Sequence, residues 1–156
     1  MKTATVRGVL AGLAILCLPA AASAQAPRGA EAEVRAAIDR LFDAMRAGDS
    51  TAVRAAFHPD ARLMSTALRD GQPQLREDAI DGFVRAVGTP HDEVWDERIS
   101  DVEIEVDDPL ASAWMEFRFY LGDRFSHCGV NAFQFVRTTD GWKVLQITDT
   151  RRASCD

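Results

Sequence analysis

The stretch ASAWMEFRFYL, residues 111–121, decides the fold class of this chain. One face of it carries the apolar side chains Met115, Phe117 and Phe119, and the other carries Trp114, Glu116, Arg118 and Tyr120. Alternation with a period of two is typical of a β-strand with one buried face. The pattern returns in residues 126–138 and 142–150, with glycine-containing turn signals between the three segments. The second half of the chain therefore predicts a meander of long antiparallel strands.

Apolar residues upstream of these strands recur at helical spacing in three places. The spacing predicts a helix over residues 32–47, a short second helix from about residue 49 to His58-Pro59, and a third that carries Ile80 and Val87. Between the last two, residues 61–65 and a piece around Gln74 are predicted as short extended segments. Three helices packed on a curved antiparallel sheet form an α+β architecture.

The first 24 residues have the three parts of a secretory signal peptide. Lys2 and Arg7 give a positive start, residues 9–18 are apolar, and a small-residue end of Ala-x-Ala type closes at Ala24. The apolar run is roughly half the ~20 residues that a membrane-spanning helix needs. We predict cleavage before Gln25 and a periplasmic or secreted protein with no membrane association afterwards.

The predicted layout is a signal peptide over residues 1–24, a disordered lead-in over 25–30 and a single domain over 31–156. Cys17 leaves a lipid-anchored alternative open, although the residue before it is the bulky Leu16 rather than the small one that lipidation needs.

The composition excludes several classes of partner. The chain has 24 acidic and 18 basic residues, a formal net charge of −6, and loss of the leader removes two of the basic ones. An acidic domain lacks the basic surface that binds nucleic acid. No spacing typical of a metal site, phosphate loop or serine-hydrolase elbow is present, so we predict no metal and no cofactor.

Two cysteines remain after the leader, Cys128 and Cys155. Neither belongs to a CxxC or His/Cys pattern, and an exported protein folds where disulfides form. We predict a bridge that ties the C-terminal tail to an earlier strand, against the alternative of a thiol nucleophile or a metal ligand.

The stretch AIDRLFDAMRAGDSTAVRAAFHPDARL, residues 37–63, resembles the opening of the nuclear-transport-factor-two-like cone fold. Residues 127–155, HCGVNAFQFVRTTDGWKVLQITDTRRASC, resemble the end of the same domain in exported bacterial members of unassigned activity. The superfamily includes SnoaL-like, ketosteroid-isomerase-like and "putative lumazine-binding" branches. The resemblance implies a curved sheet around a conical pocket, often in a homodimer. It does not imply one function, because this fold hosts enzymes, binding modules and dimerisation domains.

Strand parity gives a candidate site. We suppose a turn near Asp123 that pairs Phe119 with His127, and a three-residue loop over 139–141 that sets Asn131 opposite Asp149. Four polar side chains then converge at one end of an apolar face: His127, Asn131, Asp149 and Arg151. Such a combination is the usual character of a ligand pocket. A register slip of one residue would turn Asp149 and Arg151 outward.

We predict catalytic roles for His127 and Asp149, and ligand binding by four other residues: Asn131, Arg151, Phe117 and Phe133. A buried Asp149 beside His127 is expected to raise the pKa of the imidazole and orient its ring, as a general base needs. The alternatives are a solvated His127 at a strand edge and a plain surface ion pair between Asp149 and Arg151.

The enzyme branches of the superfamily match only in part. Met64 and Ser65 stand where the isomerase-like branch places a carboxylate base, and the dehydratase-like branch uses two pocket histidines where this chain offers His127. The epoxide-hydrolase-like branch uses an Asp-Arg-Asp set, of which Asp149 and Arg151 supply two members.

Three functions therefore remain: an exported domain that binds a small apolar or mixed-polarity ligand, an acid–base enzyme (isomerase, dehydratase or hydrolase), and a homodimeric scaffold without a ligand.

Overall fold

The computed structural model describes residues 26–155, so the predicted signal peptide and its cleavage before Gln25 lie outside the described residues. The elements follow in the order α1 (Ala26–Arg46), α2 (Ser50–Ala56), β1 (Phe57–Arg69), β2 (Gln72–Asp78), α3 (Ile80–Gly88), β3 (Trp95–Asp107), β4 (Leu110–Leu121), β5 (Arg124–Thr138) and β6 (Gly141–Thr150). The predicted α+β class is confirmed.

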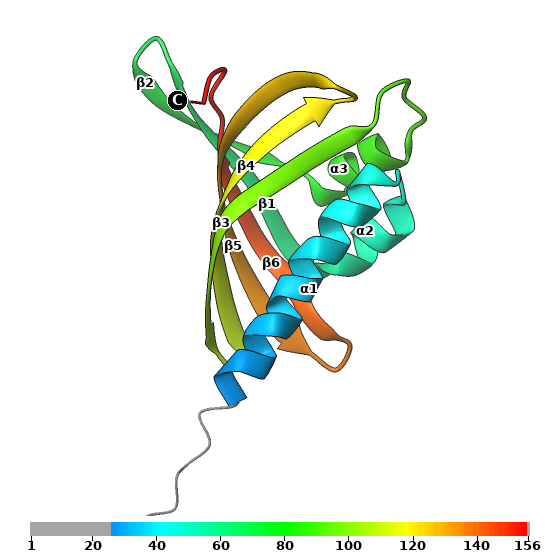
Figure 1. Cartoon of the computed structure of the whole chain (residues 1–156), viewed down its shortest axis with the longest axis vertical. Helices are drawn as coiled ribbons and strands as arrows, with labels where there is room; N and C mark the ends of the chain where they lie inside the picture. Colours follow the sequence, from blue (N-terminus) through cyan, green and yellow to red (C-terminus); the bar gives the residue numbers. More distant parts are fainter. Residues whose placement is uncertain (1–25, 156) are drawn as a thin grey trace, which may run out of the picture.

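The six strands form one curved sheet in the order β2-β1-β6-β5-β4-β3, with α1 lying along its concave side and α2 and α3 grouped near one end (Figure 1). All neighbouring strands are antiparallel except β1 and β6, which run parallel. The sheet curves round the helices, and a cavity lies between β3, β6 and α3.

The face of α1 that meets the sheet carries the apolar residues that predicted the helix. Val34 and Ile38 are fully buried, and Leu41 and Met45 are nearly so. They pack with buried residues of β4, β5 and β6, which include Met115, Phe133, Phe135 and Val144. Burial of each such side chain stabilises the fold by roughly 1.5–3 kcal/mol.

Two predicted boundaries at the helical end are wrong. α1 begins at Ala26, so the lead-in predicted over residues 25–30 is helical from there on; Pro27 fits because the backbone N–H groups of a first helical turn have no partner inside the helix. His58, Pro59 and Asp60 do not form a turn after α2 but belong to β1, which is longer than the strand predicted over 61–65. The pairing of β1 with β6 shifts register between Phe57 and Arg62, which accommodates the proline.

The pairings that the site prediction needs are all present. Phe119 lies opposite His127, Phe117 opposite Gly129, and Asn131 opposite Asp149. The route between them differs from the prediction: the β5–β6 turn leaves only two residues between Thr138 and Gly141. A bulge at Leu145 then adds one residue to β6, so that Val144 rather than Leu145 is buried while Asp149 keeps its inward parity.

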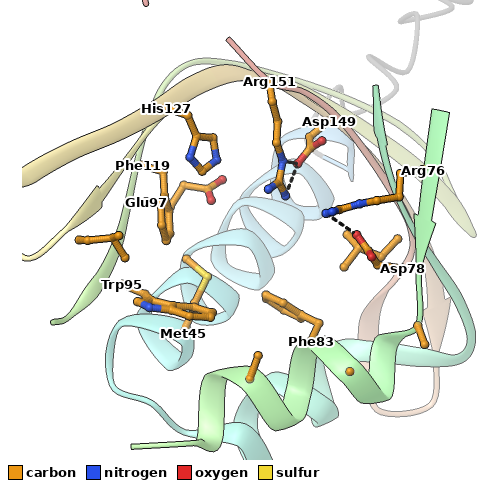
Figure 2. A pocket seen from close by; sticks show the side chains of 15 residues that line it. Met45, Arg76, Asp78, Phe83, Trp95, Glu97, Phe119, His127, Asp149 and Arg151 are labelled. Atoms are coloured by element: carbon orange, nitrogen blue, oxygen red, sulfur yellow. Dashed lines mark hydrogen bonds and ion pairs between the residues drawn. The ribbon is translucent and has the colours of Figure 1, made fainter. Parts of the chain in front are cut away.

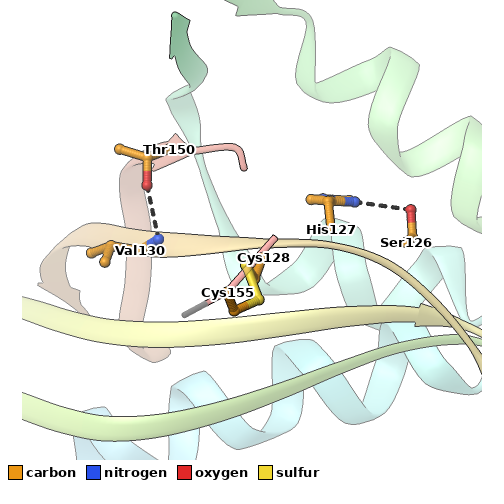
Figure 3. Close-up of a disulfide and its surroundings, with 6 residues drawn as sticks. All are labelled: Ser126, His127, Cys128, Val130, Thr150 and Cys155. Carbon is orange, nitrogen blue, oxygen red and sulfur yellow. Dashed lines mark hydrogen bonds between the residues drawn. A yellow bond between two sulfur atoms is a disulfide. The ribbon is translucent and has the colours of Figure 1, made fainter. Parts of the chain in front are cut away.

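The predicted bridge between Cys128 and Cys155 is present, with the two Cα atoms 6.2 Å apart (Figure 3). Backbone hydrogen bonds between Cys128 and Arg152, 2.8 and 3.0 Å long, carry the β5–β6 pairing past the end of β6. The tail is therefore fixed against β5 on both sides of Arg151. Within residues 26–155, no helix has the length and apolar character to cross a membrane.

Candidate functional site

A cavity of about 390 Å³ opens between α3, the end of α1 and the concave face of the sheet (Figure 2). Its walls are mainly apolar and aromatic: Met45, Leu63, Ala79, Gly82, Phe83, Ala86, Trp95, Phe119 and Leu121. Its polar lining residues are Arg76, Asp78, Glu97, His127, Asp149 and Arg151. This division into apolar walls and a few convergent polar groups is typical of small-molecule sites.

Asp149 and Arg151 form an ion pair at the sheet side of the cavity. Both Nε and Nη2 of Arg151 lie 3.1 Å from Oδ2 of Asp149. Asp149 is buried, whereas the Arg151 side chain is 44% exposed and extends into the cavity (Figure 2). The Arg151 backbone amide donates to the carbonyl of Thr66 over 3.1 Å, which holds this residue against β1 after β6 has ended.

The sequence analysis missed three of the polar lining residues, Arg76, Asp78 and Glu97, and of these Glu97 contacts a residue that it did predict. Glu97 lies near the start of β3, partly buried, and its Oε1 accepts a 2.7 Å hydrogen bond from Nδ2 of Asn131. The pKa of Glu97 is raised from 4.5 to about 7: burial is the main cause and the nearby charge of Asp149 adds to it, while Asn131 and Arg151 act in the opposite direction. Glu97 therefore exchanges its proton near neutral pH.

The sequence contains a signal for Glu97, but a local distortion of β3 hides it. Counting back in steps of two from the inward residues Val102 and Ile104 places Glu97 on the outer face. Asp101, with φ of +50°, lies in an irregularity between Ser100 and Glu103 that reverses the parity of the strand. The alternation Trp95-x-Glu97-x-Ile99, read alone, assigns Glu97 to the inner face.

His127 lines the cavity, but it does not pair with Asp149 as the sequence analysis expected. Its Nδ1 lies 3.0 Å from Oγ of Ser126, and its ring packs against Phe117 and Phe119. Burial lowers the pKa of His127, as does the charge of Arg151, and the opposing influence of Asp149 is smaller. The expected rise in pKa is therefore wrong in sign, and the imidazole is neutral at pH 7.

Two buried oxygen atoms beside the cavity have no hydrogen-bond partner among residues 26–155. They are Oδ1 of Asp149 and Oγ of Ser65, which belong to opposite residues on β6 and β1. A buried carboxylate oxygen without a donor is costly, by about 1–3 kcal/mol or more. The pair marks a place where a further donor would be stabilising.

A second ion pair lies on β2 and also lines the cavity. Nη2 of Arg76 lies 2.8 Å from Oδ2 of Asp78, and both side chains are more exposed than the Asp149 carboxylate. Figure 2 shows the Arg76 guanidinium pointing into the cavity across from Arg151.

The structure brings three of the six predicted site residues to the cavity wall: His127, Asp149 and Arg151. Asn131 is buried behind the wall, where it holds Glu97. Phe117 and Phe133 are 3% and 2% exposed and lie in the core rather than on the cavity. The rings that do line it are Phe83, Trp95 and Phe119.

The polar group is suited to proton transfer and to hydrogen bonding. Glu97 can give or take a proton near pH 7, and Arg151 can stabilise negative charge beside it. Within the described part of the chain, no three His, Cys, Asp or Glu side chains gather as a metal-binding group.

Comparison with known proteins identifies a family that matches this chain. Residues 29–148 match the family described as "putative lumazine-binding". No curated protein matches the sequence.

Similar solved structures share the fold at low sequence identity. An NTF2-like protein with a cystatin-like fold from Novosphingobium aromaticivorans superposes with a TM-score of 0.66 at 13% identity, covering 82% of this chain and 85% of its own. An NTF2-like protein of unknown function from Pseudomonas putida gives 0.63 at 19% identity, covering 83% and 96%. A structure described as a putative dehydratase of the NTF2-like family from Streptomyces avermitilis gives 0.61 at 18%, covering 81% and 99%.

Proposed function

We propose that this chain, which belongs to the "putative lumazine-binding" family, is an exported domain. We propose further that it binds a small molecule in the cavity of the cone. The single observation that carries the proposal is a cavity whose walls are mainly apolar and aromatic and carry a few convergent polar groups. The apolar part of a ligand would lie against Phe83, Trp95 and Phe119. Its polar part would meet Glu97 and the Asp149–Arg151 pair.

The cavity volume and the enclosure by α3 support a ligand of modest size. A volume of about 390 Å³ lies in the ordinary range for small-molecule sites, roughly 300–1,000 Å³. Gly82 of α3 lines this space, and a Cβ placed there meets no atom of the described residues within 4 Å, so a larger side chain has room to enter the cavity.

A cavity-filling variant tests the proposal. N-phenyl-1-naphthylamine, a neutral aromatic dye, should gain fluorescence on binding the wild-type protein and should lose at least tenfold in affinity in Gly82→Phe. Gly29→Phe is the matched control, since Gly29 lies on the exposed side of α1 and has equally open surroundings. Equal dye affinity in wild type and Gly82→Phe would contradict binding in the cavity.

A second candidate function, acid–base catalysis, is supported by Glu97. Asp149 and Arg151 supply two members of the Asp-Arg-Asp set of the epoxide-hydrolase-like branch, and Glu97 can stand in for the third. Glu97 and Asp149 both lie close enough to Arg151 to interact with its charge. A carboxyl group with a pKa of about 7 is suited to general acid–base catalysis at neutral pH. In this proposal Glu97 transfers the proton, Arg151 stabilises developing negative charge, and neutral His127 donates or accepts a hydrogen bond.

Turnover separates the two candidates. A catalyst should convert an epoxide or enone probe and lose about 10²–10⁴-fold in rate in Glu97→Gln. A binding protein should return each probe unchanged, which would leave binding as the function.

Export and dimerisation belong to the same proposal. The Cys128–Cys155 bridge suits an oxidising compartment, in line with the predicted leader. The outer sheet face exposes Trp114 by 54%, a feature that fits a subunit contact. Native mass spectrometry of protein purified from the periplasm should give a chain beginning at Gln25 and a dimer mass; a full-length monomer would contradict both.

A further inference from the structure

The charges on the cavity are not balanced, and the unpaired one is negative. Each guanidinium on the wall already has an aspartate: Arg151 pairs with Asp149, and Arg76 with Asp78. Among residues 26–155, Glu97 has no cationic hydrogen-bond partner, and its bond comes from the neutral amide of Asn131. When Glu97 is ionised, the cavity therefore holds one negative charge in excess.

The groups that face Glu97 from the surrounding elements do not remove this excess. β6 and the residue after it supply Asp149 and Arg151, whose charges cancel, and β5 supplies His127, which is neutral at pH 7. The residues by which α1 and α3 line the cavity carry no charge: Met45, Gly82, Phe83 and Ala86.

A second and independent observation points to a missing donor. Asp149 is 7% exposed and lines the cavity, yet its Oδ1 has no donor among residues 26–155. The cavity thus presents two carboxyl groups with unfilled acceptor capacity, Glu97 and Asp149, at one end.

Aromatic rings line the cavity next to Glu97, which lies opposite Phe119 in the sheet and two residues from Trp95 on β3. The rings of Trp95 and Phe119 lie with their centroids 6.2 Å apart at 74°, and Phe83 lines the cavity from α3. The faces of aromatic rings attract cations, by about 0.5–2 kcal/mol per contact. Aromatic rings beside carboxyl groups that no cation neutralises among residues 26–155 form a setting that recognises an organic cation.

We infer that the cavity is selective for small organic cations, namely a protonated amine attached to an aromatic or aliphatic group, with the ammonium at Glu97 and Asp149. This inference rests on the proposed function and adds the class of ligand to it. The ammonium donates to the Glu97 carboxylate, and the apolar group fills the aromatic part of the cavity. The acidic character of the whole chain, with a net charge of −6, favours the approach of such a ligand.

Binding of a cation is then linked to release of a proton. Glu97 is half protonated near pH 7, and an ammonium beside it favours the ionised form. If the cation binds only when Glu97 is ionised, the affinity for the cation should rise about tenfold between pH 6 and pH 8.

Three probes of similar shape and different charge test the inference on the mature protein: benzylammonium, benzyl alcohol and benzoate. By calorimetry at pH 8, benzylammonium should bind at least tenfold more tightly than benzyl alcohol, and benzoate more weakly than either. The cation should lose about tenfold in affinity at pH 6 and should release protons at pH 7. Glu97→Gln should abolish both the tighter binding of benzylammonium relative to benzyl alcohol and the pH dependence of that binding. Glu103→Gln, at an exposed position on the same strand, should preserve them.

The outcomes separate this inference from the proposed function. If benzyl alcohol or benzoate binds as tightly as benzylammonium, the cation preference is wrong and binding in the cavity stands. If none of the three probes binds, and the neutral naphthylamine dye does not bind either, both fail.

Discussion

Asn131 on β5 donates a 2.7 Å hydrogen bond to the carboxylate of Glu97 on β3, two strands away across β4. The bond explains why a buried amide is found inside an otherwise apolar core. It also fixes one oxygen of Glu97 and leaves the other for the cavity. Asn131 was predicted to bind a ligand; since it does not line the cavity and holds Glu97, we propose that it acts by positioning Glu97.

Asn131→Ala should raise the pKa of Glu97 above 7, because the lost hydrogen bond is one of the influences that lower it. NMR titration of the Glu97 side-chain carboxyl carbon measures this value directly. Gln134→Ala, exposed on the same strand, is the control and should leave the pKa unchanged. A pKa that falls or stays constant in Asn131→Ala would contradict the assigned bond.

Glu97→Gln should stabilise the protein at high pH. The folded state holds the Glu97 proton up to about pH 7, against about 4.5 in the unfolded chain, so the folded state binds more protons within this window. Stability from this group is therefore present at low pH and lost as pH rises through 7, by about 3 kcal/mol in total. Denaturant unfolding should find Glu97→Gln more stable than wild type by about this amount at pH 8 and equal to it at pH 4. A variant less stable than wild type at pH 8 would show that Glu97 is not disfavoured when charged.

Arg151→Gln should raise two pKa values together. The positive charge of Arg151 lowers the pKa of both Glu97 and His127, so its removal shifts both upward. One NMR titration of the variant follows the carboxyl carbon and the imidazole. Arg152→Gln, on the exposed tail, is the matched control, and in it the pKa values of Glu97 and His127 should equal those of the wild type. A shift in only one group would mean that Arg151 does not lie between them.

The fold could be predicted from the sequence wherever alternation was uninterrupted. Residues 110–119 of β4 and 127–134 of β5 keep an unbroken period of two, and the pairings of Phe119 with His127 and of Asn131 with Asp149 followed from it, although the β4–β5 register shifts by one residue between Phe119 and Tyr120. The β5–β6 turn was predicted one residue too long, but the bulge at Leu145 adds that residue back. Asp149 and Arg151 were thus assigned to the right face by a route that was wrong in detail.

The rest depended on features that alternation does not encode. Reversal of parity near Asp101 concealed Glu97, and the parallel pairing of β1 with β6 joins segments far apart in the sequence. The pKa of His127 depends on a balance between burial, Arg151 and Asp149 that only the positions of the side chains can decide.

Gly129→Ala should destabilise the fold by more than about 3 kcal/mol, because a Cβ at this position would lie 1.8 Å from the carbonyl oxygen of Thr150. That contact is with backbone, and the adjacent Cys128–Cys155 bridge keeps the tail from moving aside. Thermal or denaturant unfolding measures the loss. Gly82→Ala meets no atom within 4 Å and lies in a helix, so it should raise stability by up to about 1 kcal/mol. Equal stabilities of the two variants would contradict the close approach of β5 and the end of β6.

The three tryptophans report most directly on where a ligand binds. Trp95 lines the cavity, Trp114 lies on the outer face of the sheet and Trp142 is buried in the core. Each gives a separate indole N–H signal in a two-dimensional NMR spectrum. Titration with N-phenyl-1-naphthylamine should move the Trp95 signal and leave the other two in place. Movement of the Trp114 signal with Trp95 unchanged would put the ligand on the outer face and contradict the proposed function.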